Sequence, residues 1–343
     1  MFFATGYASN AALMERVSSL VRGVSMGNKV LKLFALILSI SLIPLSAFSE
    51  EKGVNVVFIP KSSDQDFWKF MRQGVDARIR EEHGVDLIWR GPAYNDDTDS
   101  QIKILQLYAK PGVDAIIISP TDQVRLIEPA KQAVALGIKL IVVDSKLDGG
   151  LEKNFVTTDN YAAGKLAAEG LSKLLGGQGK VAIIRTVKGS ASTEDRANGF
   201  IDYIKKYSPK IEISADIYAG GSSGKVYHNG GNFLKQRPQI DGVFTVNESA
   251  SDGMLRALRK EGLEGKLRFI GFDSTDFLLD GLKKHHIDGL IVQDPRRMGY
   301  LGVNAAIAAV KGNAIKDRII FVDAVMVTLD NFQKPEIQSL LTP

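Results

Sequence analysis

Short runs of β-branched and other apolar residues alternate with stretches of helical spacing along most of the chain. Nearly every run is apolar throughout, which is typical of strands buried on both faces of a parallel sheet. About nine such runs are too many for one open sheet, so the pattern predicts an α/β protein with two lobes, each built on its own parallel sheet. The predicted strands are VNVVFI (54–59), VDLIW (85–89), DAIIIS (114–119), KLIVVD (139–144), KVAIIR (180–185), IEISADIY (211–218), DGVFTV (241–246), LRFIGF (267–272) and DGLIVQ (288–293).

The segments between these runs place apolar residues at helical spacing. Among them are residues 67–82, 100–109, 162–175, 195–206 and 249–261. The sequence has no internal repeat, low-complexity tract or Pro-rich linker. We therefore expect strand-like crossings to join the two lobes instead of a flexible tether.

The N-terminal segment has the composition of a secretory signal. In NKVLKLFALILSISLIPLSAFS (28–49), two lysines precede an apolar run of about a dozen residues, and small residues then precede the charged EEK. A single membrane anchor is the alternative, but the span is short for a bilayer and Pro44 interrupts it. We expect a signal peptide over residues 1–49, cleaved after Ser49, with Met26 as an alternative start. The exported protein is then expected in the periplasm.

Composition excludes several classes of function. The chain has 43 Lys and Arg against 39 Asp and Glu, and without residues 1–49 these numbers are 39 and 38. The basic pI therefore says little about nucleic-acid or membrane partners. The sequence has no cysteine, which excludes disulfides, thiolate metal sites, a cysteine nucleophile and a lipidated cysteine. We accordingly expect a soluble exported form.

Motifs for metals, phosphates and catalysis are incomplete. NDDTD (95–99) has calcium-loop spacing, but Ser100 and Gln106 stand where such a loop has Gly and Glu, so we expect a loop and a helix cap. GGQGK (176–180) and GGSSGK (220–225) lack the Walker spacing. Four histidines offer neither a triad nor a zinc site. No catalytic residue, metal or cofactor is predicted.

Polar residues follow most of the predicted strands. In open parallel sheets, ligands bind outside the carboxyl ends of the strands, so these residues are candidate ligands. Helix N-caps favour Asp, Asn and Ser for backbone reasons, and capping explains about half of the set. It does not explain Lys61, Gln293 or Arg196, which lies one turn into the helix after KVAIIR. The residues just past the strands are Lys61, Ser119, Pro120, Asp144, Ser145, Asn247, Glu248, Asp273 and Gln293.

The segment IPKSSDQDFWKFMRQG (59–74) combines charged side chains with two large aromatics. A core has little use for Lys61 and Asp66, and a surface loop has little use for adjacent Phe67 and Trp68. A sugar ring suits both kinds, because its hydroxyls take ionised partners and its C–H faces lie against aromatic rings. Neighbours on a helix lie about 100° apart, so at most one of the two aromatics is expected to face the core.

Eight short motifs follow one another in a consistent order and spacing: DQDFWKFMRQG, GVDAIIISPTD, GIKLIVVDS, TTDNYAAG, GSASTEDRANGF, DGVFTVNESASDGMLRAL, IGFDST and IVQDPRRMG. Together they resemble the periplasmic sugar-binding proteins of ABC importers, in the ribose-binding type. The resemblance covers about 290 residues, from Val54 to near the C-terminus. It implies a type I periplasmic binding protein with two Rossmann-like lobes joined by a hinge. The N-terminal lobe is then 50–158 plus 294–321, and the C-terminal lobe 159–293 plus 322–343.

The resemblance also implies roles for particular residues. Phe67 and Trp68 fall where the family's aromatics stack on the sugar ring. Chain crossings fall near Thr158, Asp294 and Val322. The implied partners are a small sugar and the membrane permease of an ABC importer, and we expect a monomer. The implied ligands of the sugar hydroxyls are Asp144, Arg196, Asn247, Asp273 and Gln293.

Two departures leave the identity of the ligand open. The family usually has arginine where this chain has Ser145, and a small polar residue where it has Lys61. The segments IPK and VDS (143–145) look like the branch that includes autoinducer-2 and rhamnose-type binders. Lys61 and an aspartate from the same lobe also suit a carbonyl, a hydrated ketone or an acidic group.

Other classes of protein share parts of this pattern. A receptor that feeds a sensor kinase or a chemoreceptor shares the whole binding site and differs only in its partner. A DNA-binding repressor of related core fold needs a helix-turn-helix where this chain has a signal. A sugar-processing enzyme is the third alternative, and product formation would reveal it. We expect a receptor for an importer that works by hinge closure.

Overall fold

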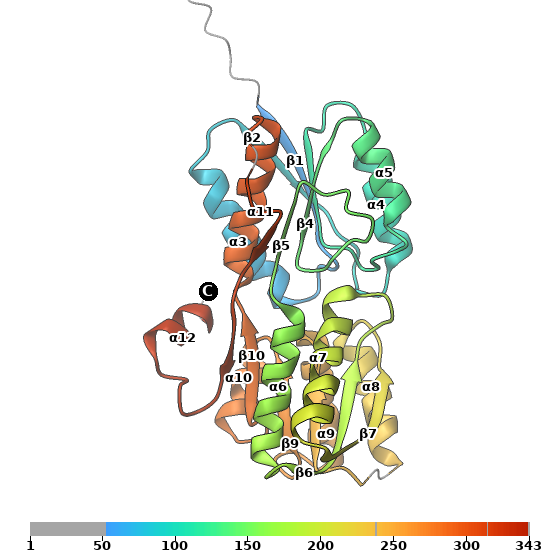
Figure 1. Ribbon diagram of the computed structural model, residues 1–343, viewed down its shortest axis with the longest axis vertical. Coiled ribbons are helices and arrows are strands. Elements are labelled where there is room, and N and C mark those ends of the chain that lie inside the picture. The colour runs from blue at the N-terminus through green and yellow to red at the C-terminus, as the bar shows by residue number, and fades with distance from the viewer. Residues whose placement is uncertain (1–52, 237–238, 314, 342–343) are drawn as a thin grey trace, which may run out of the picture. The chain divides into compact units, whose positions relative to one another are not determined.

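The computed structural model describes residues 53–236, 239–313 and 315–341. The predicted signal peptide, its cleavage site after Ser49 and the alternative start at Met26 lie outside the described residues. Within these ranges the strands form two six-stranded sheets, and helices cover both faces of each (Figure 1). The predicted α/β fold with two sheets is confirmed. No helix in the described ranges is both long and apolar enough to cross a membrane.

The first sheet is entirely parallel, and with its helices it forms what we call the first lobe. Its strands are β1 (Val54–Ile59), β2 (Val85–Trp89), β3 (Ala115–Ile118), β4 (Lys139–Val143), β5 (Asn154–Thr157) and β11 (Ile319–Phe321). Its helices are α3 (Asp66–Arg80), α4 (Thr98–Tyr108), α5 (Ile127–Ala135) and α11 (Pro295–Val310). The strand order is β11-β5-β4-β3-β1-β2, with α3 and α11 on one face and α4 and α5 on the other.

The second sheet and its helices form the second lobe. Its strands are β6 (Gln178–Arg185), β7 (Lys210–Tyr218), β8 (Gly242–Thr245), β9 (Arg268–Phe272), β10 (Gly289–Gln293) and β12 (Ala324–Val327), in the order β12-β10-β9-β8-β6-β7. Its helices are α6 (Asn160–Leu174), α7 (Ala191–Tyr207), α8 (Ser223–Lys235), α9 (Glu248–Glu261), α10 (Asp276–Lys283) and α12 (Pro335–Leu341). Helices α6 and α7 lie so close together that a Cβ on Gly164 would be 1.9 Å from the Arg196 carbonyl oxygen, so only glycine fits there.

Strand β12, which the sequence pattern does not predict, is antiparallel to β10, so the second sheet is mostly and not entirely parallel. The reason is the direction in which the chain enters the second lobe. Strand β10 leaves the sheet at its carboxyl end and leads through Asp294 into α11 of the first lobe. Strand β12 arrives from β11 of the first lobe, so it enters at the edge where the parallel strands end and runs the opposite way.

The chain passes between the two lobes at residues 158–159, at residue 294 and at residues 322–323. Strands β5, β11 and β12, which border two of these crossings, are missing from the sequence prediction. They have only three or four residues each, and β11 and β12 lie partly exposed at the sheet edges, so their apolar patterns are weak. The lobe boundaries predicted from the sequence stay predictions.

Candidate functional site

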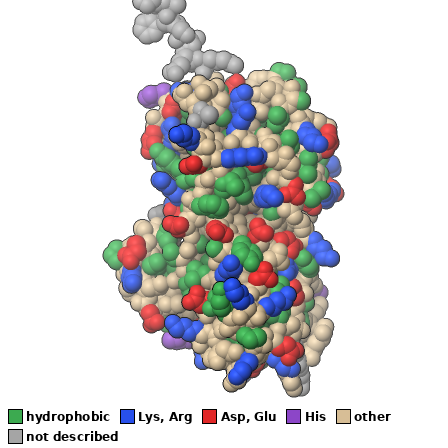
Figure 2. Space-filling view, in the orientation of Figure 1, with side chains coloured by type: hydrophobic (Ala, Val, Ile, Leu, Met, Phe, Trp, Pro, Cys, Tyr) green, Lys and Arg blue, Asp and Glu red, His purple; other side chains and the backbone are tan. Residues whose placement is uncertain are grey.

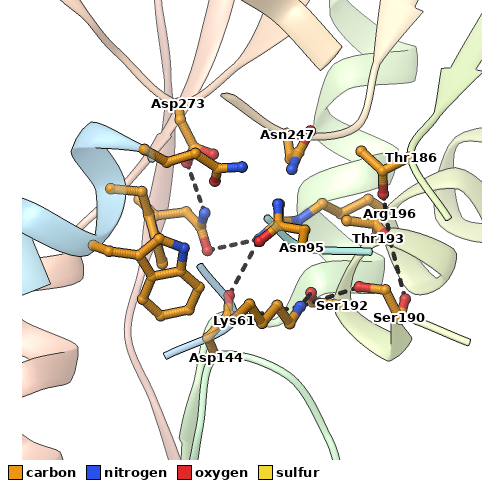
Figure 3. A pocket seen from close by; sticks show the side chains of 14 residues that line it. Lys61, Asn95, Asp144, Thr186, Ser190, Ser192, Thr193, Arg196, Asn247 and Asp273 are labelled. Atoms are coloured by element: carbon orange, nitrogen blue, oxygen red, sulfur yellow. Dashed lines mark hydrogen bonds and ion pairs between the residues drawn. The ribbon is translucent and has the colours of Figure 1, made fainter. Parts of the chain in front are cut away.

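A cavity lies between the carboxyl ends of strands from both sheets, the place where open α/β sheets bind ligands. About 340 Å³ of space between the protein atoms, part of it open to solvent, lies within the site. The first lobe lines it with the loop after β1, the start of α3, the loop before α4 and the residue after β4. The second lobe adds the loop after β6, the start of α7 and the ends of β8, β9 and β10. The lining residues are Lys61, Gln65, Phe67, Trp68, Asn95, Asp144, Thr186, Ser190, Ser192, Thr193, Arg196, Asn247, Asp273 and Gln293 (Figure 3).

Arg196 is at the centre of the second-lobe wall and is only 2% exposed. Its Nε donates to Asn160 Oδ1 at 2.9 Å, and its Nη1 donates to the Val246 carbonyl oxygen at 3.0 Å. Its Nη2 donates to Gln293 Oε1 at 2.8 Å. The guanidinium also lies over the Phe272 ring, with 3.9 Å between Cζ and the ring centroid. These contacts fix the plane of the guanidinium before any ligand is present.

Gln293 connects Arg196 to a second charged group, Asp273. Its Nε2 donates to Asp273 Oδ1 at 2.7 Å, while Asp273 Oδ2 accepts the backbone N–H of Glu248 at 3.1 Å. Burial raises the pKa of Asp273, and the positive charge of Arg196 opposes that rise. Burial likewise lowers the pKa of Arg196, and Asp273 and Asp144 oppose that fall. Arg196 and Asp273 therefore stabilise each other's charged form in this buried part of the site.

Lys61 is the second buried cation of the cavity. Its Nζ lies 3.1 Å from Asp144 Oδ2 and donates to Ser190 Oγ at 3.1 Å and to Ser192 Oγ at 2.9 Å. Because both serines belong to the second lobe, the ammonium group connects the lobes. Burial lowers the pKa of Lys61, and the neighbouring Asp144 opposes that shift. An ammonium group has three N–H donors, and all three have partners here.

Asp144 and Asp273 occupy equivalent positions in the two lobes. Each directly follows a central strand, β4 or β9, and each has a left-handed backbone, with φ of 59° and 65°. Such a conformation costs about 1–2 kcal/mol for most residues, although Asp and Asn adopt it more readily than others. Both side chains are buried and line the cavity. Strained backbone at two cavity carboxylates is typical of a functional site.

Phe67 and Trp68 are both buried, at 5% and 3% exposure, so the expectation that at most one faces the core is wrong. The rings meet edge to face, with 4.9 Å between centroids, and both pack in the core between the first sheet and α3 while lining the cavity. The reason is that the second lobe covers the first turn of α3. The Glu248 carboxylate of that lobe accepts the backbone N–H groups of Asp66 at 2.9 Å and Phe67 at 2.7 Å.

Three predicted ligands, Asp66, Ser119 and Ser145, do not line the cavity. The Asp66 carboxylate pairs with Lys69 at 2.6 Å. Ser119 Oγ donates to Asp144 Oδ2 at 2.9 Å, and Ser145 Oγ accepts the backbone N–H of Ser192 at 3.2 Å. The structure does bring together Lys61, Phe67, Trp68, Asp144, Arg196, Asn247, Asp273 and Gln293. Their roles in binding stay predictions.

Sequence reasoning missed several residues around the cavity. Thr186 directly follows the predicted strand KVAIIR, so the strand-end rule itself points to it. Asn95 lies in NDDTD, which drew attention only as an incomplete calcium loop. Glu248, which the strand-end rule does single out beside Asn247, lies just behind the wall. Burial raises its pKa well above the usual range, and nearby Asp273 acts in the same direction. The remaining missed lining residues are Gln65, Ser190, Ser192 and Thr193.

Three side chains at the cavity carry a buried polar atom that has no hydrogen-bond partner in the described part of the chain. These atoms are Gln65 Nε2, Trp68 Nε1 and Asn95 Oδ1, which are two donors and one acceptor. Leaving such an atom unsatisfied costs about 1–3 kcal/mol. Their presence around one cavity therefore points to a polar occupant. Among the described residues, no cluster of three or more His, Cys, Asp or Glu is arranged to hold a metal ion.

Comparison with known proteins gives a consistent result. A sequence profile of the family described as periplasmic binding protein domain matches residues 56–314. The D-allose-binding periplasmic protein of Escherichia coli (strain K12) is 28% identical over 88% of this chain and 99% of its own length. A ribose import binding protein of Bacillus subtilis is 25% identical over 84% of this chain and 96% of its own length.

Two solved structures are also similar. A carbohydrate transporter solute-binding protein from Agrobacterium radiobacter, in complex with D-arabinose, has a TM-score of 0.81 and 33% identity. The match covers 85% of this chain and all of that one. An ABC transporter solute-binding protein from Agrobacterium vitis with bound D-fucose also has a TM-score of 0.81, at 30% identity. That match covers 84% of this chain and all of that one.

Proposed function

The chain belongs to the periplasmic binding protein family, and we propose that it captures a small neutral sugar between its lobes and delivers it to an ABC importer. As a member of a family of transport receptors, it is a binding protein and not an enzyme. One observation carries the proposal: strand ends of both lobes supply polar groups to a single cavity of about 340 Å³.

The charges of the cavity favour an uncharged ligand. Two cations, Lys61 and Arg196, line it together with two carboxylates, Asp144 and Asp273. Lys61 has its three donors occupied, so an acidic ligand would have to replace Asp144 or the two serines as its partner. A sugar with an acidic group would also add a negative charge to a buried set that is already balanced. We therefore favour a neutral monosaccharide over the acidic ligand that Lys61 alone suggests.

Sugar hydroxyls match the three unpartnered atoms of the cavity. A hydroxyl accepts and donates hydrogen bonds, so neighbouring hydroxyls of one ring satisfy the donors of Gln65 and Trp68 and the acceptor of Asn95. All three belong to the first lobe, whereas Arg196, Asn247 and Asp273 belong to the second. A ligand that forms hydrogen bonds with both sets stabilises the closed conformation, in which the two lobes are in contact.

Contacts around the cavity hold the two lobes against each other. The backbone N–H of Gln123 donates to the Gly189 carbonyl oxygen at 2.9 Å. Asp96 Oδ2 accepts from Lys225 Nζ at 2.5 Å and from the Gly221 N–H at 3.3 Å. A sugar enters only when such contacts open, so we propose that binding is coupled to hinge closure at the three crossings.

The named relatives suggest the kind of sugar. Proteins named for D-allose and ribose, and solved structures with bound D-arabinose and D-fucose, are all similar to this chain. We propose a neutral aldopentose or aldohexose as the ligand. The assignment to the autoinducer-2 and rhamnose-type branch stays a prediction.

We further propose that the protein acts as a monomer in the periplasm, after cleavage of the signal, and docks on a membrane permease. Relatives described as periplasmic and as import proteins support this. On the face shown in Figure 2, basic and acidic side chains are interspersed over both lobes. Nucleic-acid-binding proteins instead gather basic residues on one side.

The proposed function is tested by titration calorimetry with D-allose, D-ribose, D-arabinose and D-fucose, and with D-glucuronate as a matched acidic sugar. We expect at least one neutral sugar to bind with micromolar or lower Kd, with D-glucuronate far weaker. Small-angle scattering should show a smaller radius of gyration with the bound sugar. Tighter binding of the acid would contradict the neutral-ligand proposal, and turnover of a bound sugar would contradict a receptor.

Trp68→Ala is expected to weaken sugar binding about ten- to a hundredfold, because the variant loses both the buried ring and the indole N–H. Trp68→Phe keeps an aromatic surface and loses only the N–H donor, so we expect a smaller loss, of about three- to tenfold. Calorimetry measures both. Trp89→Phe is the matched control, since Trp89 stacks on Phe58 outside the cavity. Equal affinities for wild type and Trp68→Ala would assign Trp68 to the core alone.

A further inference from the structure

The first turn of α3 is capped by a residue of the other lobe. Gln65, at the N-cap position, makes no capping bond with its side chain. Instead, Glu248 Oε1 accepts the N–H of Asp66 at 2.9 Å, and Glu248 Oε2 accepts the N–H of Phe67 at 2.7 Å. Carboxyl oxygens in this position satisfy free N–H groups of the first helical turn. The cap exists only while the lobes are together.

Glu248 is itself held by groups that line the cavity. It is the first residue of α9 and directly follows Asn247, whose side chain caps α9 by accepting the N–H of Ala250 at 3.0 Å. Its own N–H donates to Asp273 Oδ2 at 3.1 Å. Glu248 is 6% exposed but does not line the cavity. Glu248 therefore connects Asn247 and Asp273, two residues proposed to bind the sugar, to the first lobe. It does so without lining the cavity itself.

The capped N–H groups begin the segment that forms the aromatic wall. Phe67 gives one of the two N–H groups, and Trp68 is the next residue. Both rings line the cavity. When the lobes separate, both hydrogen bonds break and the first turn of α3 loses its cap. Movement of the second lobe therefore makes or breaks hydrogen bonds of the backbone segment that carries both rings.

We propose that Glu248 is a cross-lobe helix cap that stabilises the closed conformation and positions Phe67 and Trp68, and so sets ligand affinity without touching the ligand. The inference builds on the proposed sugar-binding function. The Asp96–Lys225 pair also joins the lobes, but its lysine side chain is 54% exposed. Water screens such a pair, whereas of the two Glu248 bonds the one to Phe67 is buried and the one to Asp66 is partly buried.

The test compares Glu248→Ala, Glu248→Gln and the control Asp252→Ala by calorimetry. The ligand is whichever sugar of the panel (D-allose, D-ribose, D-arabinose and D-fucose) the wild type binds most tightly. We expect the alanine variant to bind about ten- to a hundredfold more weakly. The glutamine variant should lose less, because its amide oxygen still accepts one N–H while its amide nitrogen accepts none. Asp252 lies one turn further along the same helix and pairs with Arg256 at 2.6 Å, and no bond from it to the first lobe is among the described contacts, so its variant should bind within about twofold of wild type.

Lobe closure is measured separately, by the distance between spin labels on Leu107→Cys in α4 and Tyr207→Cys in α7. The chain has no native cysteine, and the two positions are 62% and 60% exposed. With saturating sugar we expect one narrow distribution for wild type and a broader, longer one for Glu248→Ala. Unchanged affinity, or weaker affinity with an unchanged distance distribution, would overturn the inference.

Failure of the proposed function gives a different result. If wild type binds no sugar of the panel, the ligand-free distance distributions still compare the variants. A shift to longer distances in Glu248→Ala would then support the cap, and identical distributions would overturn it. If the alanine variant does not fold, Glu248→Gln carries both measurements.

Discussion

Arg196→Ala is expected to weaken sugar binding by about a hundredfold or more and to lower the free energy of unfolding by roughly 3 to 5 kcal/mol. The loss is large because the guanidinium is buried and makes three hydrogen bonds, one of them to the cavity residue Gln293. Without it, Lys61 is left as the one cation among the described lining residues, beside the carboxylates of Asp144 and Asp273. Calorimetry with the panel sugars and urea denaturation measure the two effects.

Two further variants separate charge from geometry at this position. Arg196→Lys keeps the positive charge but has no planar fork, so it should recover part of the stability and little of the affinity. Arg256→Ala removes an arginine of the same lobe whose side chain is 50% exposed, and should cost less than about 1 kcal/mol. Full sugar affinity in Arg196→Lys would show that charge alone suffices and that the fixed plane of the guanidinium has no role.

Much of the fold can be predicted from local patterns in the sequence. The run VNVVFI is β1 residue for residue, and VDLIW is β2. Burial on both faces explains the apolar run of β1, whereas β2 lies at the edge of its sheet and alternates partly buried with exposed residues. The same logic explains why Asp144 and Asp273 were found, because each ends a buried run with a polar residue. Their binding roles, like the lobe boundaries, still await the tests above.

Contacts between segments far apart along the chain cannot be predicted from the sequence patterns. Glu248 caps a helix that begins 182 residues earlier, and Asp96 meets Lys225 across the lobes. No spacing rule connects such pairs. The burial of both Phe67 and Trp68 has the same origin, since helical periodicity describes one helix against one core and α3 starts between two lobes. The direction of β12 likewise depends on which lobe the chain arrives from.

The ion pair of Lys61 and Asp144 lines the cavity and also connects the two lobes, so we expect it to affect sugar binding, lobe closure and stability. Asp144 Oδ2 receives both the ammonium group and the Ser119 hydroxyl, while the same ammonium group reaches two serines of the second lobe. Breaking a buried pair by removing one partner leaves the other charge uncompensated. Replacing both partners leaves no such charge. The two single variants and the double variant should therefore differ in a predictable way.

Lys61→Met and Asp144→Asn are each expected to lower the free energy of unfolding by about 1–3 kcal/mol. The double variant should cost at least about 1 kcal/mol less than the sum of the singles, because no unpaired charge remains. Asparagine keeps the left-handed backbone at position 144, so the cycle reports on charge and not on strain. Urea denaturation measures the cycle, with the half-exposed pair of Arg72 and Asp76 as the control, where coupling should stay below about 0.5 kcal/mol.

Sugar affinity should not recover in the double variant. Asp144 is a proposed ligand of the sugar hydroxyls, and Lys61 both orients it and holds the second lobe, so we expect all three variants to bind at least about tenfold more weakly than wild type. Recovery of stability without recovery of affinity would separate the pair's part in the fold from its part in the site. Wild-type affinity in Lys61→Met would remove Lys61 from the site. Strictly additive stabilities would show that water reaches the pair when no sugar is bound, and that the pair gains its strength only when the lobes close.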